Sequence, residues 1–272
     1  MLNSKVQLNY ITYEFLMGDK PFSIGRIGNV EGSSLTNNGA NRQLWSNAGF
    51  YGNMKQFEQW KKIYIESIKD CDVLAYVYTC NSFFTAVGDT LTSLKIYKPM
   101  IPYFEFPEFY LKFMEVLSKQ NKKIGIISSF YKDILEQSKK INLIYPNFKI
   151  NPDMFVIIES YNTCNDNVSE GHKNWEFTLN DLGKRVLEHR DVNHWFISCG
   201  CYGLPLQSIL KKNGKNSIYV GGLLQILFGI MGKRWDTRPE VIKNVNIHWK
   251  TSQYLDIKTL SNLQNVESGC YL

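Results

Sequence analysis

The feature that most constrains the fold of this chain is a repeated alternation of short apolar runs with helical patterns. Continuous apolar runs between helices are typical of strands in a buried, mainly parallel sheet. Seven such runs predict strands at 22–28, 72–78, 98–104, 122–130, 154–160, 194–200 and 216–222. Apolar residues at three- and four-residue spacing predict helices near 4–17, 29–42, 55–70, 107–120, 131–140, 173–190, 202–212 and 223–230.

This alternation predicts an α/β fold with a doubly wound, mainly parallel sheet flanked by helices, of the Rossmann-like kind. The 272 residues contain no internal repeat and no long Pro-, Gly- or Ser-rich linker, so we expect one domain spanning residues 1–272. In such folds ligands bind outside the carboxyl ends of the strands. Functional residues are therefore expected in the turns that follow strands.

Composition argues against several classes of protein. No apolar run approaches the ~20 residues of a membrane-spanning helix and the N-terminus lacks a signal-peptide pattern, so we expect a cytoplasmic protein that is not transmembrane. The net charge is +6, but 25 of the 31 basic residues are lysines spread along the chain. Because sequence-reading DNA-binding proteins rely on arginine, we expect no nucleic-acid partner. The six cysteines form no CxxC pair, and most are expected to be buried thiols.

The first candidate turn follows the run at 22–28. Gly25 and Gly28 allow a ligand to approach the backbone closely, and Asn29 is a favourable first residue for the next helix. Glu31 falls in the first helical turn, where it either complements the helix dipole or takes part in chemistry. Arg26 ends the strand in an arginine-poor chain. Together, Arg26 and Glu31 could hold an anion and a metal ion or a hydroxyl group.

The second candidate is the aromatic, glycine-broken segment at 45–52, and it has two equally supported interpretations. Exposed aromatic side chains beside a cleft commonly form a ligand wall, which would involve Trp45, Phe50 and Tyr51. The alternative is an Ω-loop that buries its own Trp and Phe. The sequence does not choose between them.

Two later glycine turns are candidate phosphate sites. The turn at 198–205 joins a strand to a helix whose first amides suit phosphate, although many α/β turns carry two glycines for geometry alone. It has neither a Walker lysine nor a dinucleotide fingerprint. The turn at 220–225 leads to a basic pair that either clamps a phosphate or caps a helix. With the end of the run at 122–130, the candidate cofactor-binding residues are Ser128, Ser129, Gly200, Cys201, Tyr202, Gly203, Gly221, Gly222, Lys233 and Arg234.

Two further patterns give no support for catalysis. Asp70 and Asp72 form a DxD sequence, but it lies at the amino-terminal side of a predicted strand, on the wrong edge of the sheet, so we interpret it as structural. The four histidines show no HExxH or triad grouping, and no GxSxG elbow exists. Serine-type hydrolase chemistry has no support.

At these turns the chain resembles the glycosyltransferases of the GT-D fold, first described as a domain of unknown function in bacterial glycan clusters. The family's first motif, F-S-x-x-R-x-G-D-G-E, is similar to FSIGRIGNVE at 22–31 except at two positions. Its later strand–turn–helix–strand is similar to residues 197–221. Blocks at 47–51 and 228–235 also look like a subgroup of bacterial and large-DNA-virus proteins along most of the chain.

The resemblance implies an α/β fold of the GT-D type and a site for a nucleotide sugar with a divalent metal ion, Mn²⁺ or Mg²⁺. In the family the Asp and Glu of the first motif serve the metal and the sugar nucleotide. This chain keeps Glu31 and has Asn29 in place of Asp. An Asn carbonyl is a neutral, weaker ligand for these ions.

We therefore expect a glycosyltransferase that moves a sugar from a nucleotide-diphosphate sugar to a glycan or lipid-linked acceptor hydroxyl. Glu31 is expected to be the metal ligand or the base, and Arg26 with the turn at 200–203 to hold the diphosphate. Trp45, Phe50 and Tyr51 are expected on the acceptor side. The alternatives are a nucleotide-cofactor enzyme such as a methyltransferase, and a non-catalytic glycan-binding relative. The sequence is also compatible with a homo-oligomer.

Overall fold

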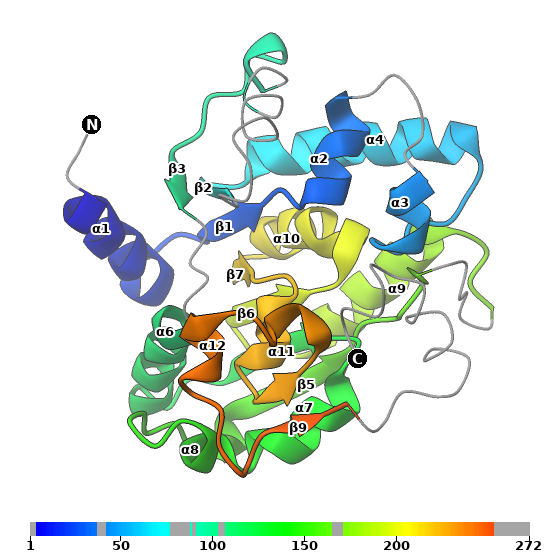
Figure 1. The fold of residues 1–272 in the computed structure, drawn as a ribbon. Coiled ribbons are helices and arrows are strands. Elements are labelled where there is room, and N and C mark those ends of the chain that lie inside the picture. Colours follow the sequence, from blue (N-terminus) through cyan, green and yellow to red (C-terminus); the bar gives the residue numbers. More distant parts are fainter. Residues whose placement is uncertain are drawn as a thin grey trace.

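The computed structural model describes residues 4–36, 42–76, 88, 91–102, 107–164 and 171–252. Its centre is an all-parallel, seven-stranded sheet in the order β3-β2-β1-β7-β6-β4-β5 (Figure 1). A short parallel pair, β8-β9, lies apart from this sheet. The strands are β1 Ser23–Arg26, β2 Val73–Tyr76, β3 Met100–Pro102, β4 Ile124–Ser128, β5 Phe155–Glu159, β6 His194–Ser198, β7 Asn216–Tyr219, β8 Ile230–Met231 and β9 Lys250–Thr251.

The helices alternate with the strands along the chain, which gives the doubly wound, Rossmann-like arrangement that the sequence predicts. Two of the long helices begin at asparagines whose side chains accept a backbone hydrogen bond: Asn53 from Gln56 and Asn174 from Phe177. The helices are α1 Ser4–Met17, α2 Asn29–Thr36, α3 Arg42–Ser46, α4 Met54–Asp70, α6 Pro107–Lys119, α7 Tyr131–Ser138, α8 Ile141–Ile144, α9 Trp175–Glu188, α10 Gly203–Lys212, α11 Leu223–Ile226 and α12 Pro239–Ile242.

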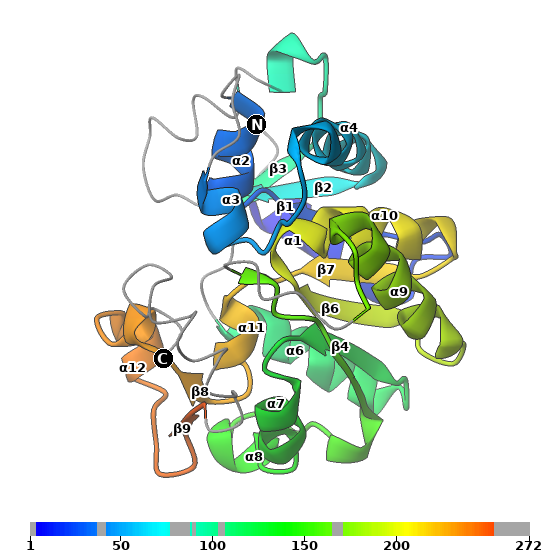
Figure 2. The same cartoon turned by 90° about the vertical axis from the view of Figure 1, so that its right-hand side faces the viewer.

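The sheet separates two hydrophobic cores. One face is covered by α4, α9 and α10, and the other by α1, α6, α7, α8 and α11 (Figure 2). Successive strand residues point to opposite faces, so Ile126 and Phe196 enter one core while Ile127 and Trp195 enter the other. Burial on both faces is the reason that these strands are continuously apolar in the sequence.

The chain leaves neighbouring strands toward opposite faces of the sheet. From β4 it runs through α7 to β5 at one edge, whereas from β6 it runs through α10 to β7 in the other direction. The two strands end level with one another, because Ser128 pairs in register with Ser198. Such a switch point leaves a crevice at the carboxyl ends of the strands, where α/β folds bind ligands.

All seven predicted strands and all eight predicted helices have counterparts in the structure. The predicted helix at 29–42 is interrupted: α2 ends at Thr36, and α3 begins at Arg42. The predicted residues 37–41, 77–78 and 103–104 lie outside the described part of the chain, as do Cys80 and Cys270. Sequence periodicity did not indicate α8, α12 or the β8-β9 pair, which are short.

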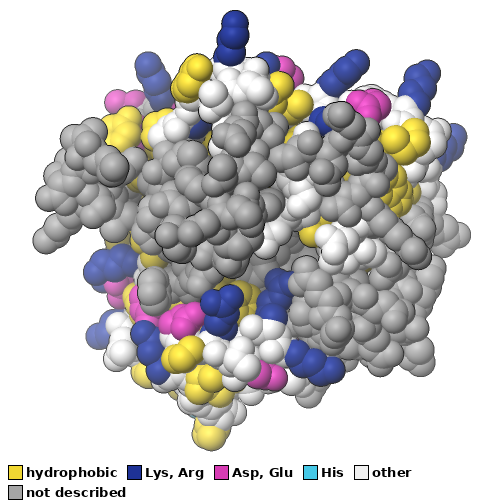
Figure 3. Space-filling model, turned by 45° about the horizontal axis from the view of Figure 1, so that its top comes forward, with side chains coloured by type: hydrophobic (Ala, Val, Ile, Leu, Met, Phe, Trp, Pro, Cys, Tyr) yellow, Lys and Arg dark blue, Asp and Glu magenta, His cyan; other side chains and the backbone are white. Residues whose placement is uncertain are grey.

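Among the described residues, no helix is both long enough and apolar enough to cross a membrane. The described Lys and Arg side chains in Figure 3 are spread from the upper rim to the lower half of the face shown, and they do not form one patch. This distribution agrees with the scattered basic residues of the sequence.

Candidate functional site

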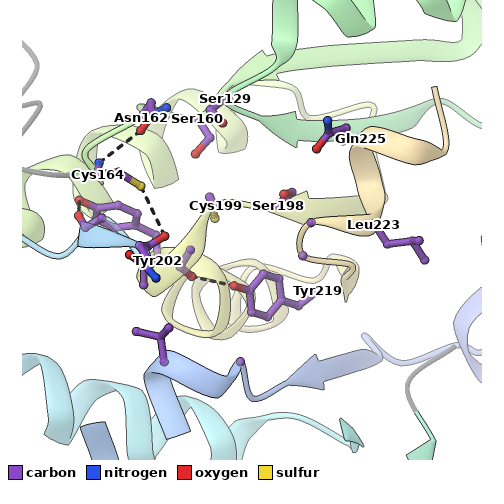
Figure 4. A pocket seen from close by; sticks show the side chains of 18 of the residues that line it. Ser129, Ser160, Asn162, Cys164, Ser198, Cys199, Tyr202, Tyr219, Leu223 and Gln225 are labelled. Carbon is purple, nitrogen blue, oxygen red and sulfur yellow. Dashed lines mark hydrogen bonds between the residues drawn. The ribbon is translucent and has the colours of Figure 1, made fainter. Parts of the chain in front are cut away.

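A cavity of about 360 Å³ lies at the carboxyl ends of the parallel strands. Its walls come from the segments that follow β1, β4, β5, β6 and β7, and from the segment around the 3₁₀ helix η4 Lys233–Trp235. Figure 4 shows labelled side chains from several of these segments around one space. Ser129 and Gln225 lie on one side of Ser198, and Tyr219 lies on the other side. Both the volume and the position suit a small-molecule site.

The cationic side chains of this cavity are all arginines. Arg26, Arg234 and Arg238 line it, and among the described lining residues there is no lysine. The whole chain has six arginines and 25 lysines. Half of the arginines therefore line this cavity. A guanidinium group presents paired donors in a plane, which matches the oxygens of phosphate better than an ammonium group does. The cavity is therefore suited to an anion with several oxygens.

Two glycines make room for two of these arginines. Gly221 has a φ of 63°, and a β-carbon there would lie 2.6 Å from Nη1 of Arg26. A β-carbon on Gly222 would lie 2.5 Å from Nη1 of Arg234. Both distances are far shorter than an ordinary contact, so any side chain at 221 or 222 would displace a guanidinium group. The glycine pair thus positions two arginines beside one turn.

The acidic side chain of the cavity is Glu31, in the first turn of α2, and it is buried with only 5% exposed. The α-carbon of Gly28 lies so close to this carboxylate that a β-carbon would overlap it. The hydroxyl of Tyr219 donates to the Gly200 carbonyl at 2.9 Å and is 3.4 Å from Oε1 of Glu31. Burial, and then the charge of Glu31, raises the pKa of Tyr219 well above its ordinary value. Tyr219 therefore stays a neutral donor beside the carboxylate.

Arg26 and Glu31 also shift the pKa of a tyrosine on the neighbouring helix α4. Tyr64 on α4 is fully buried, and burial together with Glu31 raises its pKa while Arg26 lowers it. The guanidinium of Arg26 lies 5.9 Å from the centre of the Tyr219 ring. The structure thus brings Arg26 and Glu31, both predicted from the sequence, into one charged cluster at the end of β1.

The wall beside β6 is built by hydrogen bonds between distant segments. The Gly49 carbonyl accepts from the hydroxyls of Thr163 and Tyr202. The amide of Cys201 donates to the Ala48 carbonyl at 2.8 Å. These bonds fix the segment at 47–49, whose three residues line the cavity, against the end of β6.

The aromatic residues expected on the acceptor side do not line the cavity. Phe50 and Tyr51 are buried at 0% and 4% exposure, and Trp45 packs edge-on against Phe50 and stacks with Phe57. The hydroxyl of Tyr51 bonds Thr178 instead. Of the two interpretations of this segment, the packed loop is the one that the structure supports, because the rings are a large apolar surface that α4 and α9 can bury.

Several other sequence candidates also lie away from the cavity. Gly25 faces the opposite way, since a β-carbon there would meet Leu204 on α10. Ser128 is buried, and its hydroxyl accepts from the amide of Phe130. Lys233 is exposed and is not a lining residue. The candidates that do line the cavity are Arg26, Gly28, Asn29, Glu31, Ser129, Gly200, Tyr202, Gly221, Gly222 and Arg234.

Three amides of the turn at 200–203 bond to carbonyls of the protein itself. The Cys201 amide donates to Ala48, the Tyr202 amide to Cys199, and the Gly203 amide to the Gly200 carbonyl. The expected phosphate contact through the amides of Cys201 and Gly203 therefore has no geometric support. Burial raises the pKa values of Cys199 and Cys201 well above the ordinary value, so these thiols are protonated and unreactive.

Sequence reasoning missed several lining residues, above all Arg238, Asn162 and Gln225. Asn162 follows β5, whose end was not among the candidate turns although all parallel strands end at one edge. Arg238 could have been found from the rarity of arginine. Nothing in the local sequence of the apolar helix α11 marks Gln225.

The DxD sequence lies at the amino edge of the sheet and is structural, as predicted. Asp72 accepts from the amide of Ser23 and pairs with Lys211 at 2.6 Å, and Asp70 pairs with Lys212 at 2.8 Å. Asp72 and Lys211 also line a more apolar hollow of about 870 Å³ beside α1. Asp72, through its bonds to Lys211 and Ser23, thus ties α10 to the start of β1.

The residues of the cavity fit a resident divalent metal ion poorly. Glu31 is the sole carboxylate among the described lining residues, and Asn29 is exposed. Three arginine side chains share the same space, and they repel a cation. Within the described ranges, no group of three His, Cys, Asp or Glu side chains is arranged to hold a metal. The chemistry proposed below is therefore assigned to the protein's own residues.

A comparison of the chain with models of known protein families finds no match. A search of curated proteins finds no relative at a significant level of similarity. The assignment of function consequently depends on the geometry and chemistry of the cavity.

Proposed function

We propose that this chain is a glycosyltransferase that moves a sugar from a nucleoside-diphosphate sugar to a hydroxyl group of a glycan or a lipid-linked acceptor. The observation that carries the proposal is the gathering of three of the six arginines on one cavity at the strand ends. Paired guanidinium donors suit the oxygens of a diphosphate. The similarity of residues 22–31 to the first motif of the GT-D glycosyltransferases supports the same assignment.

The reaction requires stabilisation of the departing diphosphate, on which negative charge grows as the sugar–phosphate bond breaks. Arg26 and Arg234, beside Gly221 and Gly222, supply preorganised positive charge for it. Glu31 takes the proton of the acceptor hydroxyl as the new carbon–oxygen bond forms. Tyr219, whose hydroxyl lies 3.4 Å from Oε1 of Glu31, packs beside that base.

The charge of the cavity weighs against the methyltransferase alternative. S-adenosylmethionine carries a sulfonium cation at its reactive centre. The cavity has three arginines, Arg26, Arg234 and Arg238, and one carboxylate, Glu31, among its described lining residues. Like charges in a partly enclosed site destabilise binding. A non-catalytic glycan-binding protein would use the same cavity without turnover, so a rate measurement separates it from the proposed enzyme.

The test is a thermal-shift screen of nucleoside-diphosphate sugars against S-adenosylmethionine, followed by a transfer assay with the sugar that binds. We expect the nucleoside-diphosphate sugars to raise the Tm and S-adenosylmethionine to leave it unchanged. Arg234→Lys should weaken the shift, whereas Arg190→Lys, at an exposed position outside the cavity, should preserve it. A shift produced by S-adenosylmethionine alone would contradict the proposal.

A further inference from the structure

Gln225 is a buried polar side chain without a hydrogen-bond partner at the wall of the cavity. It lies on α11, three residues after Gly222, and is only 2% exposed. Within the described ranges, neither its Oε1 nor its Nε2 has a hydrogen-bond partner. Figure 4 shows it beside the space into which Ser129 and Ser198 also face.

Among the described residues, the other two buried glutamines, Gln207 and Gln137, are used differently. Nε2 of Gln207 donates to the carbonyls of Ile24 and Ser217, and so ties α10 to two strands. Nε2 of Gln137 donates to the carbonyls of Phe228 and His248. Both side chains have a structural reason to be buried. Gln225 has none in the described part of the chain, and an unpaired buried amide costs stability.

The cavity's polar groups follow an order along the turn after β7. Tyr219 and Glu31 lie at the strand end, Arg26 lies against Gly221, and Arg234 lies against Gly222. Gln225 comes next, one helical turn further. In the order of the chain positions 219, 221, 222 and 225, these groups are a carboxylate, two guanidinium groups and an amide. A nucleoside-diphosphate sugar has the matching order of sugar, two phosphates and nucleoside.

We propose that Gln225 is the specificity-determining residue for the base of the nucleoside diphosphate. A primary amide presents one donor and one acceptor side by side, and it pairs with a base edge that offers the complementary acceptor and donor. Trp235 and Phe130, which also line the cavity, add aromatic surface for the base. This inference depends on the proposed function, because it assumes that the phosphates lie between Arg26 and Arg234.

The experiment compares calorimetric binding of inorganic pyrophosphate, uridine diphosphate and adenosine diphosphate to the wild-type protein and to Gln225→Leu. We expect one nucleoside diphosphate to bind the wild type more tightly than pyrophosphate does. Gln225→Leu should weaken that binding about tenfold and leave the pyrophosphate affinity unchanged. Comparison of the affinities for uridine diphosphate and adenosine diphosphate identifies the base with which the Gln225 amide pairs.

A stability measurement separates recognition from a structural role. Gln225→Leu should raise the Tm of the ligand-free protein by about 2–4 °C, because it removes an unpaired buried amide. Gln207→Leu is the matched control, and it should lower the Tm because it breaks the bonds to Ile24 and Ser217. A lower Tm for Gln225→Leu would overturn the inference.

The remaining outcomes are also decisive. An equal loss of pyrophosphate and nucleoside-diphosphate affinity in Gln225→Leu, or no loss of either, would overturn the role of Gln225. If the wild type binds pyrophosphate and both nucleoside diphosphates equally, the base inference fails while the arginine site stands. If the wild type binds none of the three, the proposed function itself fails.

Discussion

Gly221→Ala is a change of one methyl group that should disable the arginine site and leave the fold in place. The new β-carbon would lie 2.6 Å from Nη1 and 3.1 Å from Cζ of Arg26. Ordinary heavy-atom contacts are roughly 3.5–4.0 Å, so the guanidinium must move by about 1 Å. Because Arg26 has a flexible side chain, it can move without disturbing the sheet.

The substitution has two separate energetic effects. The φ of 63° at Gly221 is a left-handed conformation, which costs a residue with a β-carbon about 1–2 kcal/mol of stability. Displacement of Arg26 removes a charge-assisted contact to phosphate, worth about 1.5–3 kcal/mol. The expected loss of diphosphate affinity is therefore about tenfold to a hundredfold.

Gly214→Ala is the matched control. Its φ of 78° imposes the same kind of backbone strain, but a β-carbon there meets no heavy atom within 4 Å. Urea unfolding and calorimetric titration with pyrophosphate measure the two effects on both variants. Both variants should lose similar stability, and only Gly221→Ala should lose affinity. Wild-type affinity in Gly221→Ala, or an equal loss in Gly214→Ala, would refute the reasoning.

Three further predictions follow from the described geometry. Glu31→Gln should lower the transfer rate about 10²–10⁴-fold with donor affinity nearly unchanged, since it removes the base and keeps the shape; a near wild-type rate would show that Glu31 is not the base. Burial lowers the pKa of His194 from 6.5 to about 4. Between pH 6.5 and pH 4 the imidazole of His194 is therefore protonated in the unfolded chain and neutral in the folded one. The free energy of unfolding should consequently fall by about 3 kcal/mol as the pH drops from 6.5 to 4. Urea unfolding against pH checks this, and His194→Gln should flatten the fall. Asn29→Asp should raise the weak Mn²⁺ affinity measured by calorimetry without nucleotide, because it adds a second carboxylate to the cavity lining, where Glu31 is the sole one among the described residues; equal affinity in both proteins would contradict this prediction.

Most of the fold could be predicted from the sequence because buried positions must be apolar, and the spacing of apolar residues differs between strands and helices. Strands covered on both faces are mostly apolar along their length, so β4 and β6 appear as the apolar runs within 122–130 and 194–200. The long helices bury one face each, so their apolar residues recur at helical spacing. The short elements, such as α8 and the β8-β9 pair, are held by tertiary contacts and leave no such record.

The site could be predicted only in part, since its geometry depends on contacts between distant segments. Arg26 and Glu31 were marked by their positions at a strand end and a helix start, by the rarity of arginine and by the motif similarity of residues 22–31. The hydrogen bond of the Cys201 amide depends on Ala48, which lies far away in the sequence. The unpaired state of the Gln225 amide is likewise a property of the packed structure, because it requires knowledge of every neighbouring polar atom.

The most direct test of the central claim is a crystal structure of the protein with the nucleoside diphosphate that binds most tightly in calorimetry. We predict that the two phosphates lie between the guanidinium groups of Arg26 and Arg234, beside the turn at Gly221 and Gly222. Phosphates located at the turn 200–203, or outside the cavity at the carboxyl ends of the strands, would contradict it.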